Sequence, residues 1–253
     1  MNANTKETSF HYANQTEQQV RQDLAAAYRL VAHYGWDDLV FTHLSARVPG
    51  PEHHFLINPY GYLFSEITAS SLVKVDRDGE VVQSGELSRV NPAGFTIHSA
   101  VHMARDDAGA VMHLHAADGV AVSAHKEGLL PLSQTAMLCL DHLSFHDYEG
   151  VALNLDERER LTRDLQGKNL MLLRNHGLMS VGSTVAEAFT YLYFLMKACE
   201  IQVRTLGQGA AYLPSAAAIE TTRQQSQSLG QASKLTWPAL VRLMDKIDPT
   251  YAR

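Results

Sequence analysis

The sequence predicts an α/β protein in which one β-sheet is covered by helices on both faces. Segments with helical periodicity alternate with short apolar segments of strand length along the 253 residues, and this alternation is typical of layered folds. Several strands follow one another in hairpin-like fashion, so the pattern fits neither a regular βαβ winding nor a barrel. Hydrophobic residues make up 45% of the chain, which is enough for a sizeable core.

The N-terminal part is expected to contain a flexible segment, one helix and several short strands. Residues 1–15 are expected to be flexible, and residues 16–253 to form a single domain. Thr16 and Gln19 resemble a capping box, and Gly35 ends the helix that follows. Strands are predicted at 39–41, 44–48 and 55–57, and a hairpin with an Asp-Gly turn joins strands at 72–75 and 81–82.

The rest of the chain is expected to alternate helices with buried strands. Apolar residues at helical spacing, or charged residues on a surface face, predict helices at 92–105, 118–125, 155–165 and 184–206, and one loosely packed helix within 210–234. Thr236 is expected to cap a last helix, with Trp237 and Pro238 in its first turn. Apolar runs predict strands at 111–115, 170–173 and 179–182 and a short apolar piece at 151–153.

Composition excludes several classes of protein. The formal net charge is -6 and Lys and Arg form no run, which argues against nucleic-acid binding. Cys139 and Cys199 belong to no metal or disulfide spacing, and both are expected to be buried apolar residues. The polar N-terminus lacks a secretory signal and no apolar run reaches membrane-span length, so we expect a cytoplasmic protein without a membrane partner. Neither G-x-G-x-x-G nor a P-loop occurs, which disfavours dinucleotides and nucleoside triphosphates.

Three histidines form a candidate metal site. In the predicted strand, His113 and His115 project from the same face, because successive side chains of a strand alternate. A His-x-His pair alone is weak evidence in a chain with 13 histidines. His176 strengthens it, because it follows the apolar run 170–173 and precedes Gly177, where a buried strand would turn. Three imidazoles from two strand ends would make an open zinc site with a fourth position for water or substrate.

Several segments together resemble the class II aldolase/adducin family over roughly residues 16–182. The strongest are 109–115, with the Ala-Val-Ser-Ala of 121–124, and 173–177, and further matches lie at 44–48 and 57–61. The resemblance implies a three-layer α/β/α sandwich around a largely antiparallel sheet, often assembled as a homotetramer or other homo-oligomer with active sites at subunit interfaces.

The resemblance also implies a chemistry. In the sugar-phosphate aldolases and epimerases of this family, three histidines hold zinc, which here would be His113, His115 and His176. The ion stabilises an enediolate as a Lewis acid, while a carboxylate moves protons. The same three ligands would also accept Fe²⁺ or Mn²⁺. The partner implied is a small-molecule substrate.

The sequence departs from the aldolase pattern at one subsite. The family's Pro-Ser-Ser-Glu motif falls on Asn91, Pro92, Ala93 and Gly94, so a glycine stands where the acid/base glutamate should be and no serines remain for a phosphate. His43, with the threonine before it, occupies the Gly-Asn phosphate-loop position. We therefore expect a small unphosphorylated oxo- or hydroxy-acid as substrate.

No single residue is assigned as the replacement base. The nearby candidates are Tyr60, Glu66, Glu86, His98 and Tyr148. His98 and His102 are four apart on a predicted helix, and His142 and His146 have the same spacing; such pairs can chelate metal, but they lack the glutamate of a zinc-protease helix. General-base work requires hydrogen-bond reach to the substrate proton, which a sequence does not give.

Three functions remain open at this point. The first is a zinc-dependent lyase that breaks a carbon–carbon bond on an altered substrate, and the second is a decarboxylase-like or oxygenase-like metalloenzyme on the same scaffold. The third is a non-catalytic binding module like the head of adducin. That head resembles an aldolase domain without its metal ligands, so the presence of His113, His115 and His176 favours the enzymes.

Overall fold

A single sheet of eight strands runs through the computed structural model, which describes residues 15–83, 89–150 and 156–253. The strand order is β4-β3-β2-β1-β5-β8-β7-β6, and all neighbours pair antiparallel except β6 and β7. The strands are β1 His43–Arg47, β2 Phe55–Ile57, β3 Val73–Val75, β4 Val81–Gln83, β5 Ala110–Leu114, β6 Leu143–His146, β7 Leu170–Leu173 and β8 Gly177–Gly182. The prediction of a largely antiparallel sheet is confirmed.

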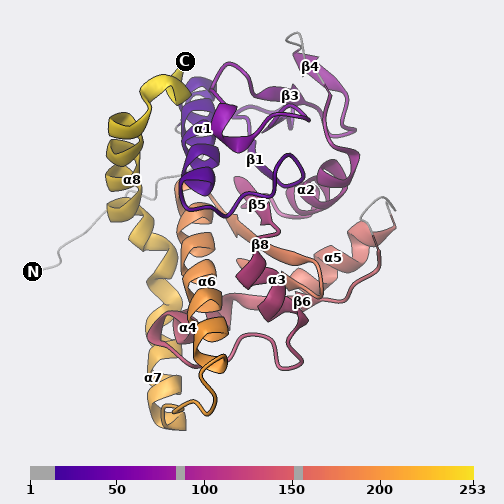
Figure 1. Cartoon of the computed structure of the whole chain (residues 1–253). Coiled ribbons are helices and arrows are strands. Elements are labelled where there is room, and N and C mark those ends of the chain that lie inside the picture. The colour runs from indigo at the N-terminus through magenta and orange to yellow at the C-terminus, as the bar shows by residue number, and fades with distance from the viewer. Residues whose placement is uncertain (1–14, 84–88, 151–155) are drawn as a thin grey trace, which may run out of the picture.

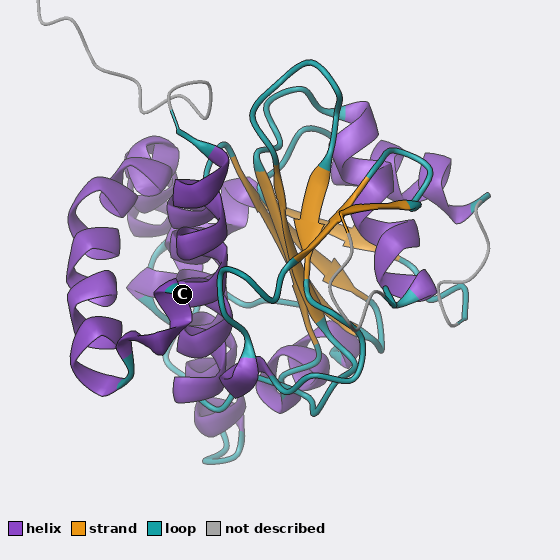
Figure 2. Ribbon diagram, turned by 90° about the horizontal axis from the view of Figure 1, so that it is seen from above, coloured by secondary structure: helices purple, strands orange, loops and turns teal. Residues whose placement is uncertain are grey.

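Helices cover both faces of this sheet, which confirms the three-layer α/β/α sandwich (Figures 1 and 2). The α-helices are α1 Glu17–His33, α2 Pro92–Ala104, α3 Ala117–Ala124, α4 Gln134–Cys139, α5 Glu157–Leu165, α6 Val185–Leu206, α7 Ala216–Gln225 and α8 Ser233–Ile247. Short 3₁₀ helices are η2 Phe64–Glu66, η3 Leu140–His142, η4 Ser226–Ala232 and η5 Pro249–Ala252. Strand β5 separates two cores: Met112 and Leu114 pack with α1 and α6, whereas Val111 packs with α2 and α5.

Helix α1 fixes the entrance to β1. Its capping box is the predicted one, because Thr16 accepts a hydrogen bond from the Gln19 N–H and the Gln19 side chain accepts one from the Thr16 N–H. Tyr28 is fully buried, and its hydroxyl accepts a 2.8 Å hydrogen bond from the Leu44 N–H. The same hydroxyl lies 2.8 Å from Asn58 Oδ1. Tyr28 of α1 therefore joins the start of β1, where His43 lies, to Asn58, the residue that follows β2.

The strand predicted at 39–41 is wrong. These residues form a turn, in which Leu39 has a positive φ of 49° and Leu39 and Phe41 are 64% and 47% exposed. A strand needs a neighbouring strand to pair with. The pairing of β1 with β2 and β5 begins only at His43, so residues 39–41 have no partner strand. The turn instead brings Asp38 toward the end of β5.

The C-terminal region also differs from expectation. Residues 210–234 contain α7 and then η4, and η4 leads directly into α8 at Ser233. Because the chain is already helical there, Thr236 lies inside α8 and is not its cap, and its hydroxyl contacts that of Thr190 at 3.2 Å. Pro238 likewise lies inside the helix.

Several other helices and strands form where they were predicted, whereas one helix and one strand were not predicted. The hairpin of β3 and β4, helix α5, strand β7 with its partner β8, and helix α6 all form where predicted. Helix α4 and strand β6 were not predicted, and the apolar piece at 151–153 lies outside the described residues. Cys139 and Cys199 are free and buried as expected, and burial raises the pKa of the Cys139 thiol to about 12. None of the described helices is long and apolar enough to span a bilayer.

Candidate metal centre

Strand β5 positions two of the three predicted histidines. Val111 and His113 share one face of β5, and His113 is paired across β1 with His43 and across β8 with Met179. His115 follows directly after the last residue of β5. His113 is 1% exposed and His115 is partly exposed, so the pair lies where the buried strand reaches the surface.

The turn between β7 and β8 supplies the third histidine. Asn175 adopts a positive φ of 57°, and His176 follows it with its N–H donating to the Leu173 carbonyl. Gly177 packs so closely on β5 that an added Cβ would overlap the Leu114 carbonyl oxygen and lie 3.2 Å from Cδ2 of His115. The missing side chain at Gly177 therefore lets His176 come close to His115.

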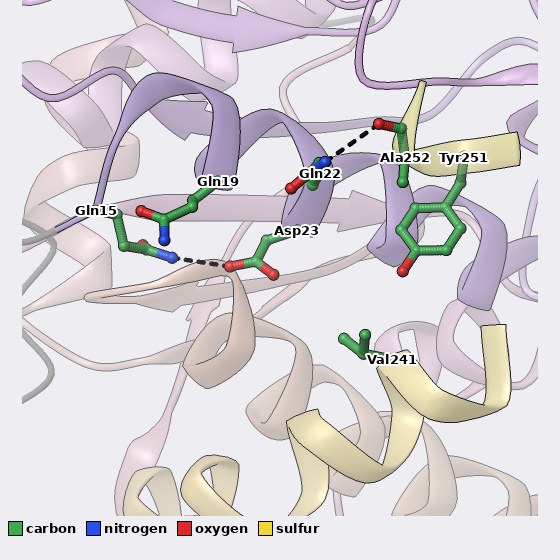
Figure 3. A pocket seen from close by; sticks show the side chains of 7 residues that line it. All are labelled: Gln15, Gln19, Gln22, Asp23, Val241, Tyr251 and Ala252. Carbon is green, nitrogen blue, oxygen red and sulfur yellow. Dashed lines mark hydrogen bonds between the residues drawn. The ribbon is translucent and has the colours of Figure 1, made fainter. Parts of the chain in front are cut away.

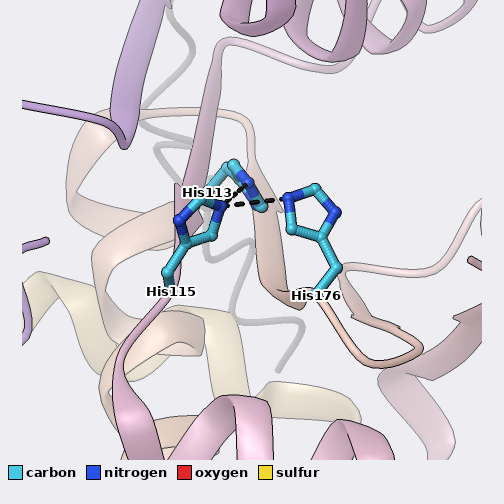
Figure 4. A group of neighbouring side chains, drawn as sticks. All are labelled: His113, His115 and His176. Atoms are coloured by element: carbon cyan, nitrogen blue, oxygen red, sulfur yellow. Dashed lines mark hydrogen bonds between the residues drawn. The ribbon is translucent and has the colours of Figure 1, made fainter. Parts of the chain in front are cut away.

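The three imidazoles converge through their Nε2 atoms (Figure 4). Nε2 of His115 lies 3.0 Å from Nε2 of His113 and 3.0 Å from Nε2 of His176. In the described part of the chain, these three residues form the one group of at least three His, Cys, Asp or Glu side chains close enough to hold an ion, with ligand atoms within 4.8 Å of one another. Nitrogen ligands of one tetrahedral zinc ion are about 3.3 Å apart, given Zn–N bonds of about 2.0 to 2.1 Å.

Two hydrogen bonds behind the site fix the tautomers. The Nδ1–H of His113 donates to the Leu178 carbonyl at 3.1 Å, and the Nδ1–H of His115 donates to Oδ2 of Asp38 at 3.1 Å. Each neutral ring then has a lone pair on Nε2. Two lone pairs that face each other cannot share a hydrogen bond, so the arrangement suits a cation placed between the rings.

Burial keeps the imidazoles of His113 and His176 unprotonated. Desolvation holds the pKa of His113 well below its usual value, and the nearby imidazole of His176 adds to this shift. Burial, followed by the influence of His115, lowers the pKa of His176 to about 4. At neutral pH both rings are therefore in the neutral form that binds metal.

The position of the missing glutamate is filled by another side chain. A Cβ at Gly94 would overlap the His43 ring and lie 2.6 Å from its Nε2. The ring of His43 is 3% exposed, and its centroid is 5.4 Å from that of His113. His43 thus occupies space next to the histidine cluster that a side chain at position 94 would otherwise enter.

The five candidates for a replacement base have different locations. Glu66 is exposed and its Oε2 accepts a hydrogen bond from the Leu63 N–H. Tyr60 is 41% exposed in a turn, and Glu86 lies outside the described residues. Tyr148 has a ring contact with His176, with centroids 6.4 Å apart. His98 is buried and bonds to His43.

Neither pair of histidines at four-residue spacing forms a chelate in the described structure. His98 and His102 are bridged by the hydroxyl of Ser45, which lies between their rings. His142 donates from Nε2 to the Ser226 carbonyl. His146 donates from Nδ1 to Oδ2 of Asp164, and it lines a small hollow together with Tyr148 and His176.

Sequence reasoning missed Asp38 as the partner of His115 and His43 as the neighbour of His113. Both contacts depend on the turn at 39–41 and on the pairing of β1 with β5, which no local pattern reveals. His43 had one signal, because it falls on a functional loop position of the resembled family.

A larger cavity lies elsewhere, between α1, α8 and η5 (Figure 3). It measures about 320 Å³ and is lined by Gln15, Gln19, Gln22, Asp23, Val241, Tyr251 and Ala252. Its side chains are already paired: Gln15 Nε2 donates to Asp23 Oδ2 at 2.8 Å, and Gln22 Nε2 donates to the Ala252 carbonyl at 3.2 Å. It contains none of the three clustered histidines.

Comparison with known proteins identifies the family. The profile described as "Class II Aldolase and Adducin N-terminal domain" matches residues 22–203. The chain belongs to the class II aldolase and adducin family. A Caulobacter vibrioides relative named "Putative aldolase class 2 protein" is 57% identical over 242 residues, which cover 94% of each chain. This class II aldolase family member therefore matches that relative over nearly all of its length.

Solved structures and adducins also resemble the chain. An aldolase II superfamily protein from Pseudomonas syringae has a TM-score of 0.91 and 46% identity, over 94% of this chain and 96% of that one. L-fuculose 1-phosphate aldolase from Glaciozyma antarctica has a TM-score of 0.81 and 28% identity, over 94% and 93%. Rat alpha-adducin is 49% identical over 75% of this chain, which is 26% of the adducin. Class II aldolases and adducins thus share this fold.

Proposed function

We propose that this class II aldolase family member is a metal-dependent lyase that uses His113, His115 and His176 to hold one divalent ion, zinc in the first instance. The observation that carries the proposal is the convergence of their Nε2 atoms, with two of the opposite ring nitrogens donating to Leu178 and Asp38. Such outer partners orient metal-bound imidazoles and raise their basicity. The similarity to class II aldolases, which extends over residues 22–203 in the family match and over 94% of the chain in the structural match, also supports the proposal.

The proposed reaction breaks a carbon–carbon bond next to a carbonyl group. A divalent ion held by His113, His115 and His176 would supply Lewis acidity, which stabilises negative charge that develops on substrate oxygens. Burial keeps His113 and His176 neutral, and hydrogen bonds to Leu178 and Asp38 orient the rings of His113 and His115. The arrangement of Gly94 and His43 supplies a neutral imidazole where a carboxylate would be needed for the ordinary aldolase proton transfer.

The proposed substrate is a small unphosphorylated oxo- or hydroxy-acid. At the resembled phosphate subsite, the described chain offers the buried His43, whose pKa burial holds well below the usual value. A neutral ring gives a phosphate no charge to pair with. Arg174, which lies near the hollow beside His176, already donates to the His125 carbonyl and stacks on Phe145.

Metal content after substitution tests this proposal. His113→Ala should remove the ion from purified protein while the far-ultraviolet circular dichroism stays unchanged, because one of three ligands is lost on a solvent-reaching strand end. His142→Ala is the matched control, since His142 bonds to the Ser226 carbonyl and not to the cluster. Elemental analysis by mass spectrometry gives the ion per chain. Equal metal content in both variants would refute the assignment.

A second candidate function rests on the similarity to adducin. The 49% identity with rat alpha-adducin over 75% of this chain supports a non-catalytic binding module as the alternative. The two functions differ in their need for an ion at His113, His115 and His176. A chain that remains folded and free of divalent metal at micromolar zinc would favour the binding module.

A further inference from the structure

A chain of buried hydrogen bonds runs behind the candidate metal centre from β1 into α2. Nδ1 of His43 lies 3.0 Å from Nε2 of His98, and Nδ1 of His98 lies 2.5 Å from the Ser45 hydroxyl. The same hydroxyl lies 2.8 Å from Nε2 of His102, whose Nδ1 lies 3.0 Å from the Ala108 carbonyl. All four side chains are at most 3% exposed.

The carbonyl at the far end decides where the protons lie. A carbonyl oxygen only accepts, so the proton of His102 must be on Nδ1, and its Nε2 accepts from the Ser45 hydroxyl. The Ser45 oxygen has then used its proton and must accept from Nδ1–H of His98. Nε2 of His98 consequently accepts from Nδ1–H of His43.

This order leaves Nε2 of His43 without a proton. The assignment holds for neutral rings, and the burial of His43, His98 and His102 disfavours the charged form of each ring. Burial also lowers the pKa of His102 to about 3. His43 is therefore the last ring in this series of hydrogen bonds, and its Nε2 has a free lone pair.

The ring that carries this free nitrogen lies next to the candidate metal centre. His43 and His113 are directly paired across β1 and β5, so their side chains share one face of the sheet, and their ring centroids are 5.4 Å apart. Gly94 faces the edge of the ring that carries Nε2, and the absence of a side chain there leaves room for that edge. Nearby, the hydroxyl of the buried Thr42 has no hydrogen-bond partner among the described residues.

We propose that His43 is a specificity-determining residue whose Nε2 accepts a hydrogen bond from a hydroxyl group of the substrate or of zinc-bound water. This inference rests on the proposed metal-dependent function. A hydroxyl can donate to the lone pair, whereas a phosphate or carboxylate oxygen has only lone pairs and is disfavoured there. His98, Ser45 and His102 are positioning residues that hold the required tautomer of His43.

Neutron diffraction from perdeuterated, zinc-loaded crystals soaked in glycolate locates these protons directly. We expect deuterium on Nδ1 of His43, His98 and His102, and an O–D group of glycolate or zinc-bound water directed at Nε2 of His43. Deuterium on Nε2 of His43, or no O–D group within hydrogen-bond distance of it, would overturn the proposal. Crystals that bind no zinc would instead refute the proposed function. The deuterium positions would still test the assigned protons of the hydrogen bonds from His43 to His102.

Ligand discrimination in solution provides a second measurement. The probes are glycolate and acetate, which differ by one hydroxyl group, and calorimetry of zinc-loaded protein gives both affinities. His43→Phe keeps a ring against Gly94 but removes the acceptor, so the ratio of glycolate to acetate affinity should fall about five- to tenfold. Zinc content should not change. An unaltered ratio in His43→Phe would contradict the assigned role.

The positioning role is tested at Ser45. Ser45→Ala removes the hydroxyl that joins His98 and His102, and it should lower the same affinity ratio, whereas Ser45→Thr retains a hydroxyl and should restore it. A purely structural role would make both variants alike in this ratio. That result would show that Ser45 does not control the tautomer of His43, and it would overturn the positioning role of His98, Ser45 and His102.

Discussion

Asp38 illustrates how a single carboxylate can orient a histidine of the candidate metal centre. Its Oδ2 accepts the Nδ1–H of His115, which leaves Nε2 of that ring free for an ion. Asp38→Asn should therefore weaken zinc affinity about 10- to 100-fold, because an amide is a poorer acceptor for the ring. Competition with a zinc chelator measures the effect, and Asp37→Asn in the same loop is the control. Equal affinity in the two variants would remove Asp38 from the site.

Gly94 and His43 form a second pair that a mutant cycle can test. Gly94→Ala places a methyl group against the His43 ring, and it should lower the free energy of unfolding by about 1–3 kcal/mol through overpacking. Alanine would otherwise be favoured over glycine in a helix.

The double variant provides the decisive comparison. In the background of His43→Ala, the same Gly94→Ala change should lose its cost or become stabilising, because the obstructing ring is gone. Urea unfolding of the four proteins gives the coupling. Additive effects would show that the two side-chain positions do not share space.

At the scale of single residues, local pattern predicted which three histidines lie together but not their hydrogen-bond partners. Alternation along a strand was sufficient to place His113 and His115 together, and the end of an apolar run pointed to His176. Asp38 and His43 reach the cluster through a turn and a cross-strand register. Those depend on long-range pairing, which has no signature within either segment.

Between elements, the contact of the β7–β8 turn with β5 is the one on which the site depends. Gly177→Ala should lower the free energy of unfolding by about 1–3 kcal/mol and weaken zinc binding, because a Cβ there overlaps the Leu114 carbonyl and presses on His115. Gly207→Ala is the control, since its Cβ would meet its nearest neighbour, the Val203 carbonyl, at an ordinary 3.4 Å. Thermal unfolding and zinc titration of both variants provide the comparison, and equal effects would contradict this account.

Elements with local signals were predictable and the others were not. The capping box at Thr16 and the Asp-Gly hairpin turn carry their own hydrogen-bond chemistry, so α1 and the β3–β4 hairpin could be predicted. Strand β6 is stabilised by parallel pairing with β7, more than twenty residues later in the chain. Residues 39–41 are apolar, but no neighbouring strand extends to them.

For the whole molecule, the buried histidines predict a loss of stability in acid. The unfolded chain takes up protons on these rings near the ordinary pKa of 6.5, whereas the folded chain resists until a pKa of about 4 at His176 and about 3 at His102. The unfolded state therefore binds more protons below pH 6.5, and the free energy of unfolding should fall as the pH falls from 6.5 toward 4.

Chelator-treated protein shows this dependence without competition from metal. Each such histidine contributes a slope of about 1.4 kcal/mol per pH unit within the window, so His102→Gln should reduce the slope by about that amount. The exposed His33 provides the control His33→Gln, which should leave the slope unchanged. A wild-type stability that is flat between pH 6.5 and 4 would contradict the buried neutral state of these rings.

Anomalous diffraction at the zinc edge tests most directly whether the three imidazoles share one metal ion. Crystals of protein purified without chelator and supplied with zinc should show one strong anomalous peak per chain, bonded to Nε2 of His113, His115 and His176 at about 2.0 to 2.1 Å. A map without a peak between these three rings, in crystals where the zinc is bound elsewhere or not at all, would contradict the account.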